Sequence, residues 1–301
     1  MKVLVTGITG FFAPFAVREL TEAGHEVVLF SRKEPPEEFR ELKCIQGDIN
    51  NIRDCLKAMQ DQKIETIVHI AAWPTPTDQK ERYPDRYDDP DFFPQTMQTN
   101  VMGTYNMLEA AVRNGVKHFL LLGSNCMLGH INRSSGRPFP VYYLPIDEML
   151  PSDIEDSYSL SKFIDEEILH RYTRCYGIRT TILRSGWIFD EKMRKEWPDK
   201  VKASEKLWDY FNPYVSAEDE AVYIRILLEK RDELPMFGAY FCNADDTLAL
   251  EPTMELIDKF CPEQVPRMTT ILGGYKSFIS NQKLKDITGY TPQFSWRKDK
   301  N

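Results

Sequence analysis

Tyr158 and Lys162 lie four residues apart in the stretch Y-S-L-S-K, which follows an acidic, proline-containing segment and begins an amphipathic pattern. On a helix this spacing places both side chains on one face, one turn apart. A phenol with a pKa of about 10 is a poor base at neutral pH, but a nearby ammonium favours its charged form, as general acid–base catalysis requires. A chain of this composition contains about one Tyr-x-x-x-Lys pair by chance, so the pair must be judged by its surroundings.

A glycine-containing turn, T-G-I-T-G-F-F-A at residues 6–13, directly follows the first apolar run. Glycines at a strand–helix junction permit a tight turn and bring backbone amides close to a pyrophosphate, while the following helix offers its positive end. Ala13 takes the third small position. The sequence therefore predicts a dinucleotide site with contacts from Gly7, Thr9, Gly10, Phe11 and Phe12.

The second apolar run ends in Ser31, Arg32 and Lys33, where a NAD-binding protein usually places a carboxylate for the ribose 2′-hydroxyl. Two cations and a hydroxyl can instead bind a 2′-phosphate. We therefore expect NADP as the preferred cofactor, with NAD as the alternative, although Arg32 and Lys33 could also be simply solvated. Asp48, in Q-G-D-I, is placed to accept from the adenine amino group, or to serve only as a turn residue.

Strand and helix patterns alternate along the first two thirds of the chain. Six apolar runs are expected to be buried parallel strands (2–7, 25–30, 43–48, 65–72, 117–124 and 179–186), and helical patterns lie between them (14–24, 52–60, 96–115 and 158–177). Gly24, Gly115 and Gly177 are placed as helix stops. A further helix at 217–230 and a strand at 238–245 complete the pattern. The predicted fold class is α/β, a doubly wound parallel sheet of Rossmann type.

Two segments depart from this alternation: a loop at 73–95, rich in Pro, Asp and aromatic residues, and a proline-containing stretch at 125–156. The first is expected to form a wall of the substrate pocket, with a solvated surface loop as the alternative. The last 50 residues or so resemble small helices that cap one edge. We expect a nucleotide-binding domain at 1–186 and 214–248, and a small substrate-binding lobe at 187–213 and 249–301.

Taken together, these motifs resemble the extended short-chain dehydrogenase/reductase family, also called the NAD-dependent epimerase/dehydratase family. The resemblance covers about residues 1–250 and includes, in order, T-G-x-x-G-x-x-A, G-D-I, H-I-A-A, N-V-x-G-T-x-N-x-L-E-A-A, G-S-N-C-M-L-G, P-I-D-E, Y-S-L-S-K and L-R-S-G. It implies that Tyr158, Lys162, Ser124 and Asn100 are catalytic, with Ser124 merely completing a strand end as the alternative. Further cofactor contacts are then expected at Ile49, Ala71, Ala72, Trp73, Asn100, Tyr158, Lys162 and Gly186.

The resemblance also narrows the chemistry. Dehydratases of this family usually carry an acidic pair after the serine position, where this chain has Asn125 and Cys126. The lobe is small for a nucleotide-sugar clamp and is more similar to uronate dehydrogenases, although those normally use NAD. The leading hypothesis is an oxidoreductase of a small sugar or sugar-derived hydroxyl or carbonyl compound. The alternatives are a nucleotide-sugar epimerase with tightly bound cofactor, and a redox-sensing NADP-binding regulator. Substrate contacts are expected from Trp73, Ser124, Asn125, Trp187 and Arg194, with a merely solvated Arg194 as the alternative.

Composition agrees with such an enzyme. The net charge of −8 argues against nucleic acid or an anionic membrane as a main partner. The six cysteines are scattered, without a Cys-x-x-Cys pair, so no metal site or disulfide framework is indicated. The amino-terminal apolar run is too short for a signal peptide, and no run approaches the ~18 apolar residues of a membrane span. A cytoplasmic homodimer acting on a small molecule is expected.

Overall fold

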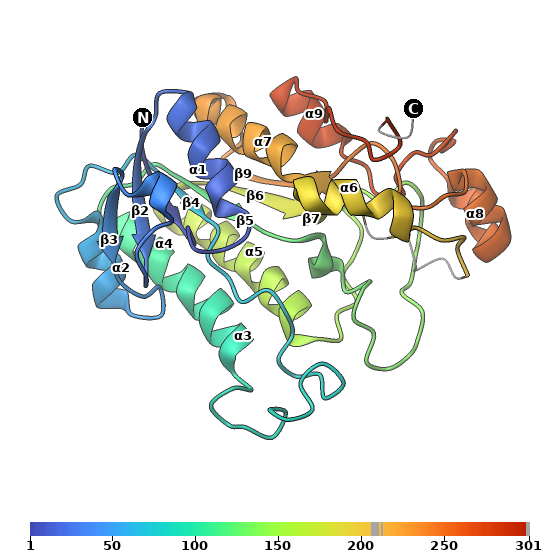
Figure 1. Cartoon of the computed structure of the whole chain (residues 1–301), viewed down its shortest axis with the longest axis horizontal. Coiled ribbons are helices and arrows are strands. Elements are labelled where there is room, and N and C mark those ends of the chain that lie inside the picture. Colours follow the sequence, from blue (N-terminus) through green and yellow to red (C-terminus); the bar gives the residue numbers. More distant parts are fainter. Residues whose placement is uncertain (206–210, 212, 299–301) are drawn as a thin grey trace.

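The computed structural model describes residues 1–205, 211 and 213–298, so parts of both predicted lobe segments (206–210, 212 and 299–301) lie outside the described residues. A seven-stranded parallel sheet forms its centre (Figure 1). From edge to edge the strands are β3 (Lys43–Gln46), β2 (Glu26–Ser31), β1 (Lys2–Thr6), β4 (Thr66–His69), β5 (His118–Leu122), β6 (Arg179–Ser185) and β9 (Phe237–Cys242). The order reverses between β1 and β4, and this confirms the predicted doubly wound fold.

Two layers of helices cover the sheet (Figure 1). On one face lie α1 (Ala13–Glu22) and α7 (Ala217–Glu229), and on the other α2 (Ile52–Met59), α4 (Gly103–Arg113) and α5 (Ser157–Tyr176). Successive strand side chains point to opposite faces, so Val3 and Val5 join the first core whereas Leu4 joins the second. This explains why the strands read as continuous apolar runs rather than as alternating ones.

The predicted helix stops are confirmed. Gly24, Gly115 and Gly177 follow α1, α4 and α5 with φ angles of +81°, +71° and +67°, a conformation that other residues rarely adopt. At the other end of α5, the side chain of Asp156 accepts hydrogen bonds from the amides of Tyr158 and Ser159, both at 2.9 Å. The helix that carries the Tyr–Lys pair therefore has a defined beginning and end.

The remaining elements lie beyond β6. A small parallel pair, β7 (Trp187–Phe189) and β8 (Tyr214–Ser216), precedes α7, and α6 (Glu191–Lys200) follows β7. The carboxyl-terminal residues contribute α8 (Thr253–Phe260) and α9 (Gln282–Thr288). Lys283 of α9 donates to the carbonyl of Ala239 at 3.0 Å, so this helix lies against the edge strand β9 as the sequence suggested. Among the described helices, none is long and apolar enough to cross a membrane.

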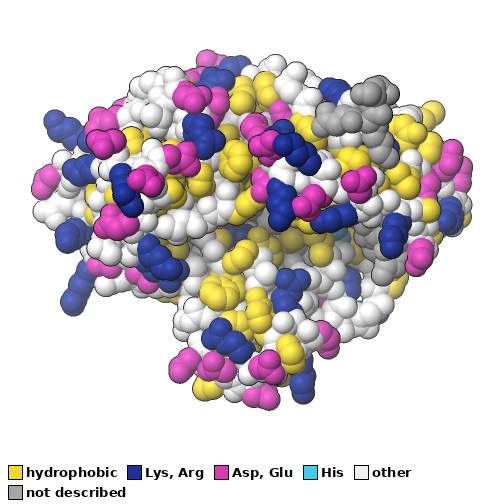
Figure 2. All heavy atoms as spheres, viewed as in Figure 1, with side chains coloured by type: hydrophobic (Ala, Val, Ile, Leu, Met, Phe, Trp, Pro, Cys, Tyr) yellow, Lys and Arg dark blue, Asp and Glu magenta, His cyan; other side chains and the backbone are white. Residues whose placement is uncertain are grey.

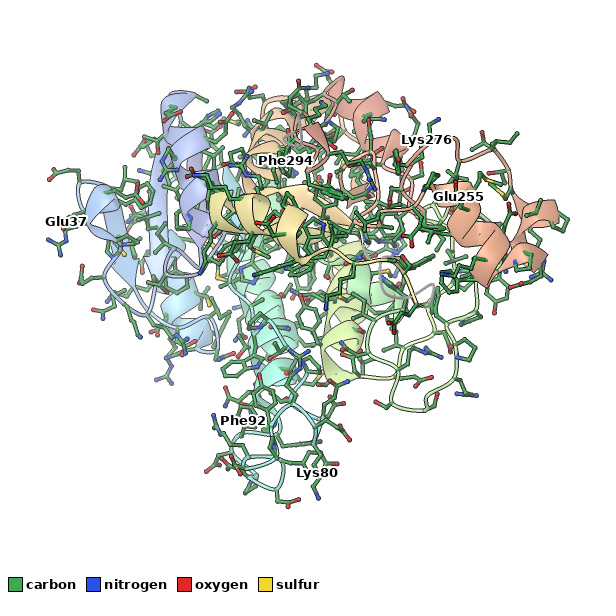
Figure 3. The ribbon with its side chains drawn as sticks, turned by 45° about the vertical axis from the view of Figure 1, so that its right-hand side comes forward. Glu37, Lys80, Phe92, Glu255, Lys276 and Phe294 are labelled. Carbon is green, nitrogen blue, oxygen red and sulfur yellow. The ribbon has the colours of Figure 1, made fainter. Side chains whose placement is uncertain are left out.

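The segment 73–95 contains no helix or strand before α3 (Gln95–Met97). It projects from the rest of the molecule, and Lys80 and Phe92 lie within the projection (Figures 1 and 3). On the face shown in Figure 2, basic and acidic side chains are interspersed, and hydrophobic ones gather around a hollow between the projection and the body.

Candidate active site

The turn between β1 and α1 forms one wall of a cavity. Gly7 has a φ angle of +82°, and a Cβ atom at this position would lie 2.8 Å from the backbone nitrogen of Ala71. Only glycine lets the two chain segments approach so closely. The first turn of α1 has neither a side-chain cap nor an acidic residue. Pro14 has no amide hydrogen and the Phe15 amide donates to the Phe12 carbonyl at 3.0 Å, so the pyrophosphate that the sequence predicted is expected at the loop before the helix.

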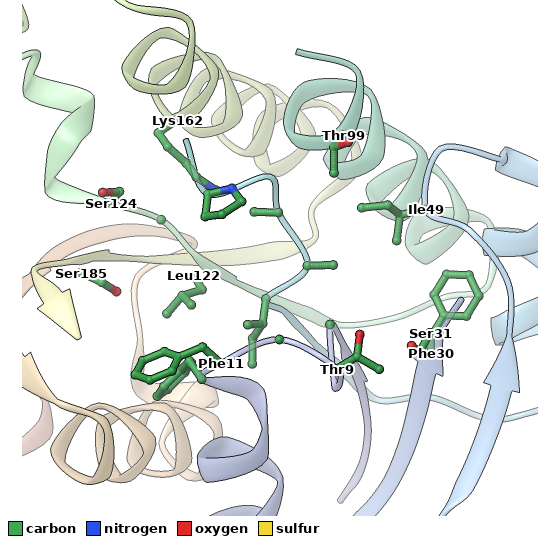
Figure 4. Close-up of a pocket in the computed structure, with 18 of the residues that line it drawn as sticks. Thr9, Phe11, Phe30, Ser31, Ile49, Thr99, Leu122, Ser124, Lys162 and Ser185 are labelled. Atoms are coloured by element: carbon green, nitrogen blue, oxygen red, sulfur yellow. The ribbon is translucent and has the colours of Figure 1, made fainter. Parts of the chain in front are cut away.

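The cavity has a volume of about 480 Å³ and runs along the carboxyl ends of the central strands (Figure 4). Ser31 and Phe30 lie at one end in this view, whereas Lys162 and Ser124 lie at the other. Fifteen of the residues predicted to contact cofactor or substrate line it: Gly7, Thr9, Gly10, Phe11, Phe12, Ser31, Arg32, Asp48, Ile49, Ala71, Ala72, Ser124, Tyr158, Lys162 and Gly186. The volume is typical of a site for a bound organic molecule.

Ser31 and Arg32 form the end of the cavity beside β2. Ser31 is buried, and its hydroxyl accepts from the Lys33 amide at 3.3 Å. Arg32 is exposed, lines the cavity and forms no ion pair with a described residue. Asp48 accepts from the amide of Asn50 at 2.9 Å, which is a turn contact, and it also lines the cavity. Both readings of Asp48 from the sequence are therefore compatible with its position.

Tyr158, Lys162 and Ser124 meet at the opposite end. The Lys162 nitrogen lies 5.8 Å from the centre of the Tyr158 ring. Ser124 lies two residues after β5 and is buried, and its hydroxyl acts to lower the pKa of the Tyr158 phenol, which favours the charged phenolate. The Ser124 oxygen also accepts from the Cys126 amide at 3.2 Å. Three groups that can bind or transfer a proton thus face one space.

The electrostatics of this end differ from the expectation. Burial raises the pKa of the Tyr158 phenol, and this effect exceeds the lowering by Ser124. Burial also lowers the pKa of Lys162, although the neighbouring Asp165 carboxylate opposes that shift. The sequence argument predicted a net lowering of the phenol pKa, which is wrong in direction because the spacing of two residues does not reveal the burial of the phenol.

Asn100 acts on the backbone around the cavity. It lies in a π-helical turn, Gln98–Met102, that leads into α4. Its side chain accepts from the Trp73 amide at 2.7 Å and donates to the Trp73 carbonyl at 3.1 Å and to the Ser161 hydroxyl at 2.9 Å. Asn100 therefore fastens the end of the β4 loop to α5. Asn100 is not one of the described residues that line the cavity.

The segment 73–95 is attached to the same helix. The Asp78 carboxylate accepts from the amide and hydroxyl of Ser157, at 2.9 and 2.7 Å. Within the segment, the Trp73 and Phe92 rings meet edge to face at 5.8 Å. The segment is thus attached to the residue that precedes Tyr158, while most of residues 80–91 are exposed in the projection.

Six predicted residues do not line the cavity: Lys33, Trp73, Asn100, Asn125, Trp187 and Arg194. Arg194 lies on α6, where its guanidinium pairs with Glu218 at 2.6 Å and lies 5.0 Å from the centre of the Phe294 ring. The structure therefore gives Arg194 a carboxylate partner within the protein. Asn125 is buried near His130, at 3.4 Å, and Trp187 is half exposed against Phe189.

Other lining residues were not predicted. They are Phe30, Gly47, Asn50, Ile70, Pro74, Thr99, Leu122, Gly123, Ser185 and Ile188. Nearly all lie at strand ends or next to a predicted motif. Extending each motif by one or two residues at the carboxyl end of its strand would have found most of them.

The fold and the cavity define a dinucleotide-binding protein with a Ser–Tyr–Lys group at one end of the site. Residues 3–189 match the model of the NAD dependent epimerase/dehydratase family, which is well over half of the chain. The chain belongs to this family, and the resemblance seen in its motifs is confirmed.

The individual relatives share less than a third of their residues with this chain over the matched regions. UDP-glucose 4-epimerase of Lactobacillus helveticus is 28% identical over 192 residues, covering 61% of this chain and 51% of that protein. Human short-chain dehydrogenase/reductase family 42E member 1 is 29% identical over 215 residues, covering 68% of this chain and 50% of that protein. The chain thus spans about half the length of the curated relatives it matches.

Solved structures share the fold over nearly the whole chain. UDP-glucose 4-epimerase of Thermotoga maritima, with UDP-glucose, superposes with a TM-score of 0.69 at 18% identity, covering 98% of this chain and 94% of that one. A mutated uronate dehydrogenase gives a TM-score of 0.62 at 19% identity, covering 99% and 84%. At such identities the likeness concerns the fold alone.

Proposed function

We propose that this protein is an NAD(P)-dependent oxidoreductase that acts on a hydroxyl or carbonyl group of a small sugar or sugar-derived compound. The observation that carries the proposal is the convergence of Tyr158, Lys162 and Ser124 at one end of a cavity whose other end is built by the glycine turn and β2. The family and the fold support it.

The residues present fit a nicotinamide dinucleotide. The Gly7 turn approaches Ala71 so closely that only a backbone without Cβ fits, and α1, whose first turn carries no acidic residue, begins shortly after it. A pyrophosphate suits that position. At the far end, the Lys162 ammonium would hold ribose hydroxyls, which suits its burial at the end of the cavity.

The proposed mechanism assigns one task to each side chain. A bound nicotinamide supplies the acceptor or donor of the hydride. The Tyr158 phenol gives a proton to the substrate oxygen in reduction and takes it back in oxidation. Ser124 donates a hydrogen bond to the same oxygen and orients it. The Lys162 ammonium favours the phenolate at the moment when the phenol has lost its proton.

We propose NADP as the preferred cofactor. Support comes from Ser31 and Arg32, which line the cavity where β2 ends and offer a hydroxyl and a cation there. Asp48 lies on the next strand loop, where it suits the adenine. Structures of family members in complex with NAD, such as UDP-glucose 4-epimerase of Thermus thermophilus, leave NAD as the alternative.

We propose that the segment 73–95 forms a wall of the substrate pocket, and that 187–213 and 249–301 form a small substrate-binding lobe. Attachment of the segment to Ser157, next to Tyr158, supports this. Half-buried Trp73 and buried Phe92 pack edge to face within the segment and stiffen it.

A first experiment is to purify the protein, denature it and record the absorbance of any released cofactor. Free sugars, uronic acids and UDP-sugars are then screened for reduction of NADP or NAD, with Tyr158→Phe as the matched control. We expect turnover of a free sugar or sugar acid that the variant loses. Tightly bound cofactor with interconversion of UDP-sugars and no net redox change would favour the epimerase alternative. Absence of any cofactor binding would refute the proposal.

We also propose a homodimer in the cytoplasm. Met102, Tyr105, Leu160 and Tyr176 are exposed on the π-helical turn, α4 and α5, and the rings of Tyr105 and Tyr176 both pack on Tyr172. An apolar helix pair of this kind suits a second copy of the chain. The six free cysteines are consistent with a reducing compartment. Light scattering tests the dimer, and a monomer at all concentrations would refute it.

A further inference from the structure

Asp165 is a buried carboxylate next to the catalytic lysine. It lies one turn after Lys162 on α5, and its Oδ2 atom is 3.7 Å from the Lys162 nitrogen. Both side chains are almost completely buried. Neither Asp165 oxygen has a well-formed hydrogen bond among the described residues. Burial raises the pKa of Asp165 to about 7, and the Lys162 ammonium and the Thr104 hydroxyl oppose that rise, so the carboxylate is charged above about pH 7. A carboxylate in such a place costs free energy unless a cation compensates for it.

The other titratable groups around the pair are neutral or already paired. On β4, burial lowers the pKa of His69 to about 3, and this ring is hydrogen-bonded to the Thr6 hydroxyl. In the turn after β5, burial raises the pKa of Cys126 to about 11. On α5 itself, the two Glu166 carboxylate oxygens accept from the Nε and one terminal nitrogen of Arg184, both at 2.9 Å. Tyr158 is an uncharged phenol at neutral pH.

Asp165 is therefore the group that offers a negative charge to Lys162 among the described residues. Its effect on the lysine is opposite to that of burial: the carboxylate raises the pKa of Lys162, whereas burial lowers it. An opposite charge at this distance typically shifts a pKa by about 1–3. Burial is the larger of the two effects, so the pKa of Lys162 is lowered on balance and the carboxylate limits that lowering.

We propose that Asp165 is a positioning residue of the active site: it holds the Lys162 ammonium in place and keeps it charged inside the protein. The proposal deepens the proposed function and rests on it, because Lys162 matters only if a dinucleotide and a substrate occupy the cavity. It adds a fourth member to the Ser–Tyr–Lys group, one that touches neither cofactor nor substrate and acts through Lys162.

The direction of its effect on pH dependence follows. Without the carboxylate, Lys162 loses its proton at a lower pH because burial is no longer opposed. The Asp165 charge also raises the pKa of the Tyr158 phenol, so its removal lets the phenol ionise at a lower pH. Both ionisations therefore move the same way. A residue that only fills space would lower activity or stability without displacing these ionisations.

The test measures cofactor binding, which requires no knowledge of the substrate. Binding of NADPH or NADH, whichever the wild type holds more tightly, is followed by nicotinamide fluorescence between pH 6 and pH 10. Affinity is expected to fall as Lys162 loses its charge. In Asp165→Asn the midpoint of this fall should move to lower pH by about 1 or more. Asp165→Glu should restore most of the shift, and Lys162→Met should bind weakly without a comparable midpoint.

Glu167→Gln is the matched control, because it removes an exposed carboxylate from the same helix and should leave the midpoint unchanged. Thermal unfolding establishes that each variant folds, and Asp165→Ser, which is also uncharged, replaces Asp165→Asn if that variant does not. An unshifted midpoint in a folded, uncharged variant would overturn this inference alone. Absence of NADPH and NADH binding by the wild type would overturn the proposed function and this inference together.

Discussion

Replacing Ser31 by Asp and Arg32 by Ala should reverse the cofactor preference. Ser31 is the last residue of β2, and its buried hydroxyl already accepts from the Lys33 amide. An aspartate there can keep that contact while presenting a carboxylate to a ribose 2′-hydroxyl. Arg32 lines the cavity and is not occupied by an ion pair with a described residue. Its guanidinium is therefore available to a 2′-phosphate.

The magnitude follows from the interactions gained and lost. A hydrogen bond to a charged group contributes about 1.5–3 kcal/mol, which corresponds to about 10- to 150-fold in affinity. The wild type should therefore bind NADP at least about tenfold more tightly than NAD. In the double variant this contribution disappears. A carboxylate about 4 Å from the 2′-phosphate adds a repulsion of about 1–4 kcal/mol near the surface, so NAD becomes the preferred ligand.

Titration of both cofactors against both proteins measures the effect directly, by fluorescence or calorimetry. Lys33→Ala serves as the matched control, because Lys33 is exposed and does not line the cavity among the described residues, so its loss should leave the ratio unchanged. Equal affinities of the wild type for NADP and NAD would show that Arg32 points to solvent. The absence of an acid at this strand end would then have no bearing on selectivity.

Three further outcomes are expected. Tyr158→Phe should lower turnover by about 10²–10⁴-fold and leave cofactor affinity nearly unchanged; near wild-type rates would exclude the phenol as the acid–base group. Gly7→Ala should destabilise the fold by about 1–2 kcal/mol and weaken dinucleotide binding on the order of tenfold, because a Cβ would approach the Ala71 nitrogen to 2.8 Å; calorimetric scans with and without cofactor test both effects. Burial raises the pKa of Glu220 from its usual value to about 8, so the folded state keeps a proton that the unfolded chain releases above about pH 4.5, and this group makes stability fall as pH rises toward 8. Glu220→Gln should flatten that slope in chemical denaturation, and an unchanged slope would contradict it.

The order of elements could be predicted because each depends on local pattern. Parallel strands buried on both faces read as apolar runs, and helices end at glycines such as Gly177 whose conformation other residues avoid. The cofactor cradle was predictable for the same reason, since Gly7 and α1 are adjacent in sequence. Tyr158 and Lys162 lie on one helix, so their spacing alone placed them on one face.

Other features depend on contacts between distant segments. Asn100 could be assigned to the site by resemblance, but its clamp on Trp73 and Ser161 joins residues 27 and 61 positions away. Arg194 was predicted to pair with a substrate carboxylate or to be solvated, whereas it forms an ion pair with Glu218 of α7. The sign of the phenol pKa shift depended on burial, which no spacing reveals. A role for Asp165 could not be predicted from the sequence, because an acid three residues after a lysine usually indicates a solvated helix face.

Side chains from three other segments form hydrogen bonds with the first turns of α5, and these bonds fix the position of Tyr158. Asp156 caps the helix, Asp78 binds Ser157 from the 73–95 segment, and Asn100 binds Ser161 from the π-helical turn. General acid–base catalysis requires its groups to be placed within a fraction of an ångström, so such bracing fixes Tyr158 before any substrate arrives. One of these braces, Asp78, belongs to the segment proposed as the substrate wall. Displacement of that wall by a substrate would therefore act directly on the helix that carries the phenol, which links recognition of the substrate to the position of the acid–base group.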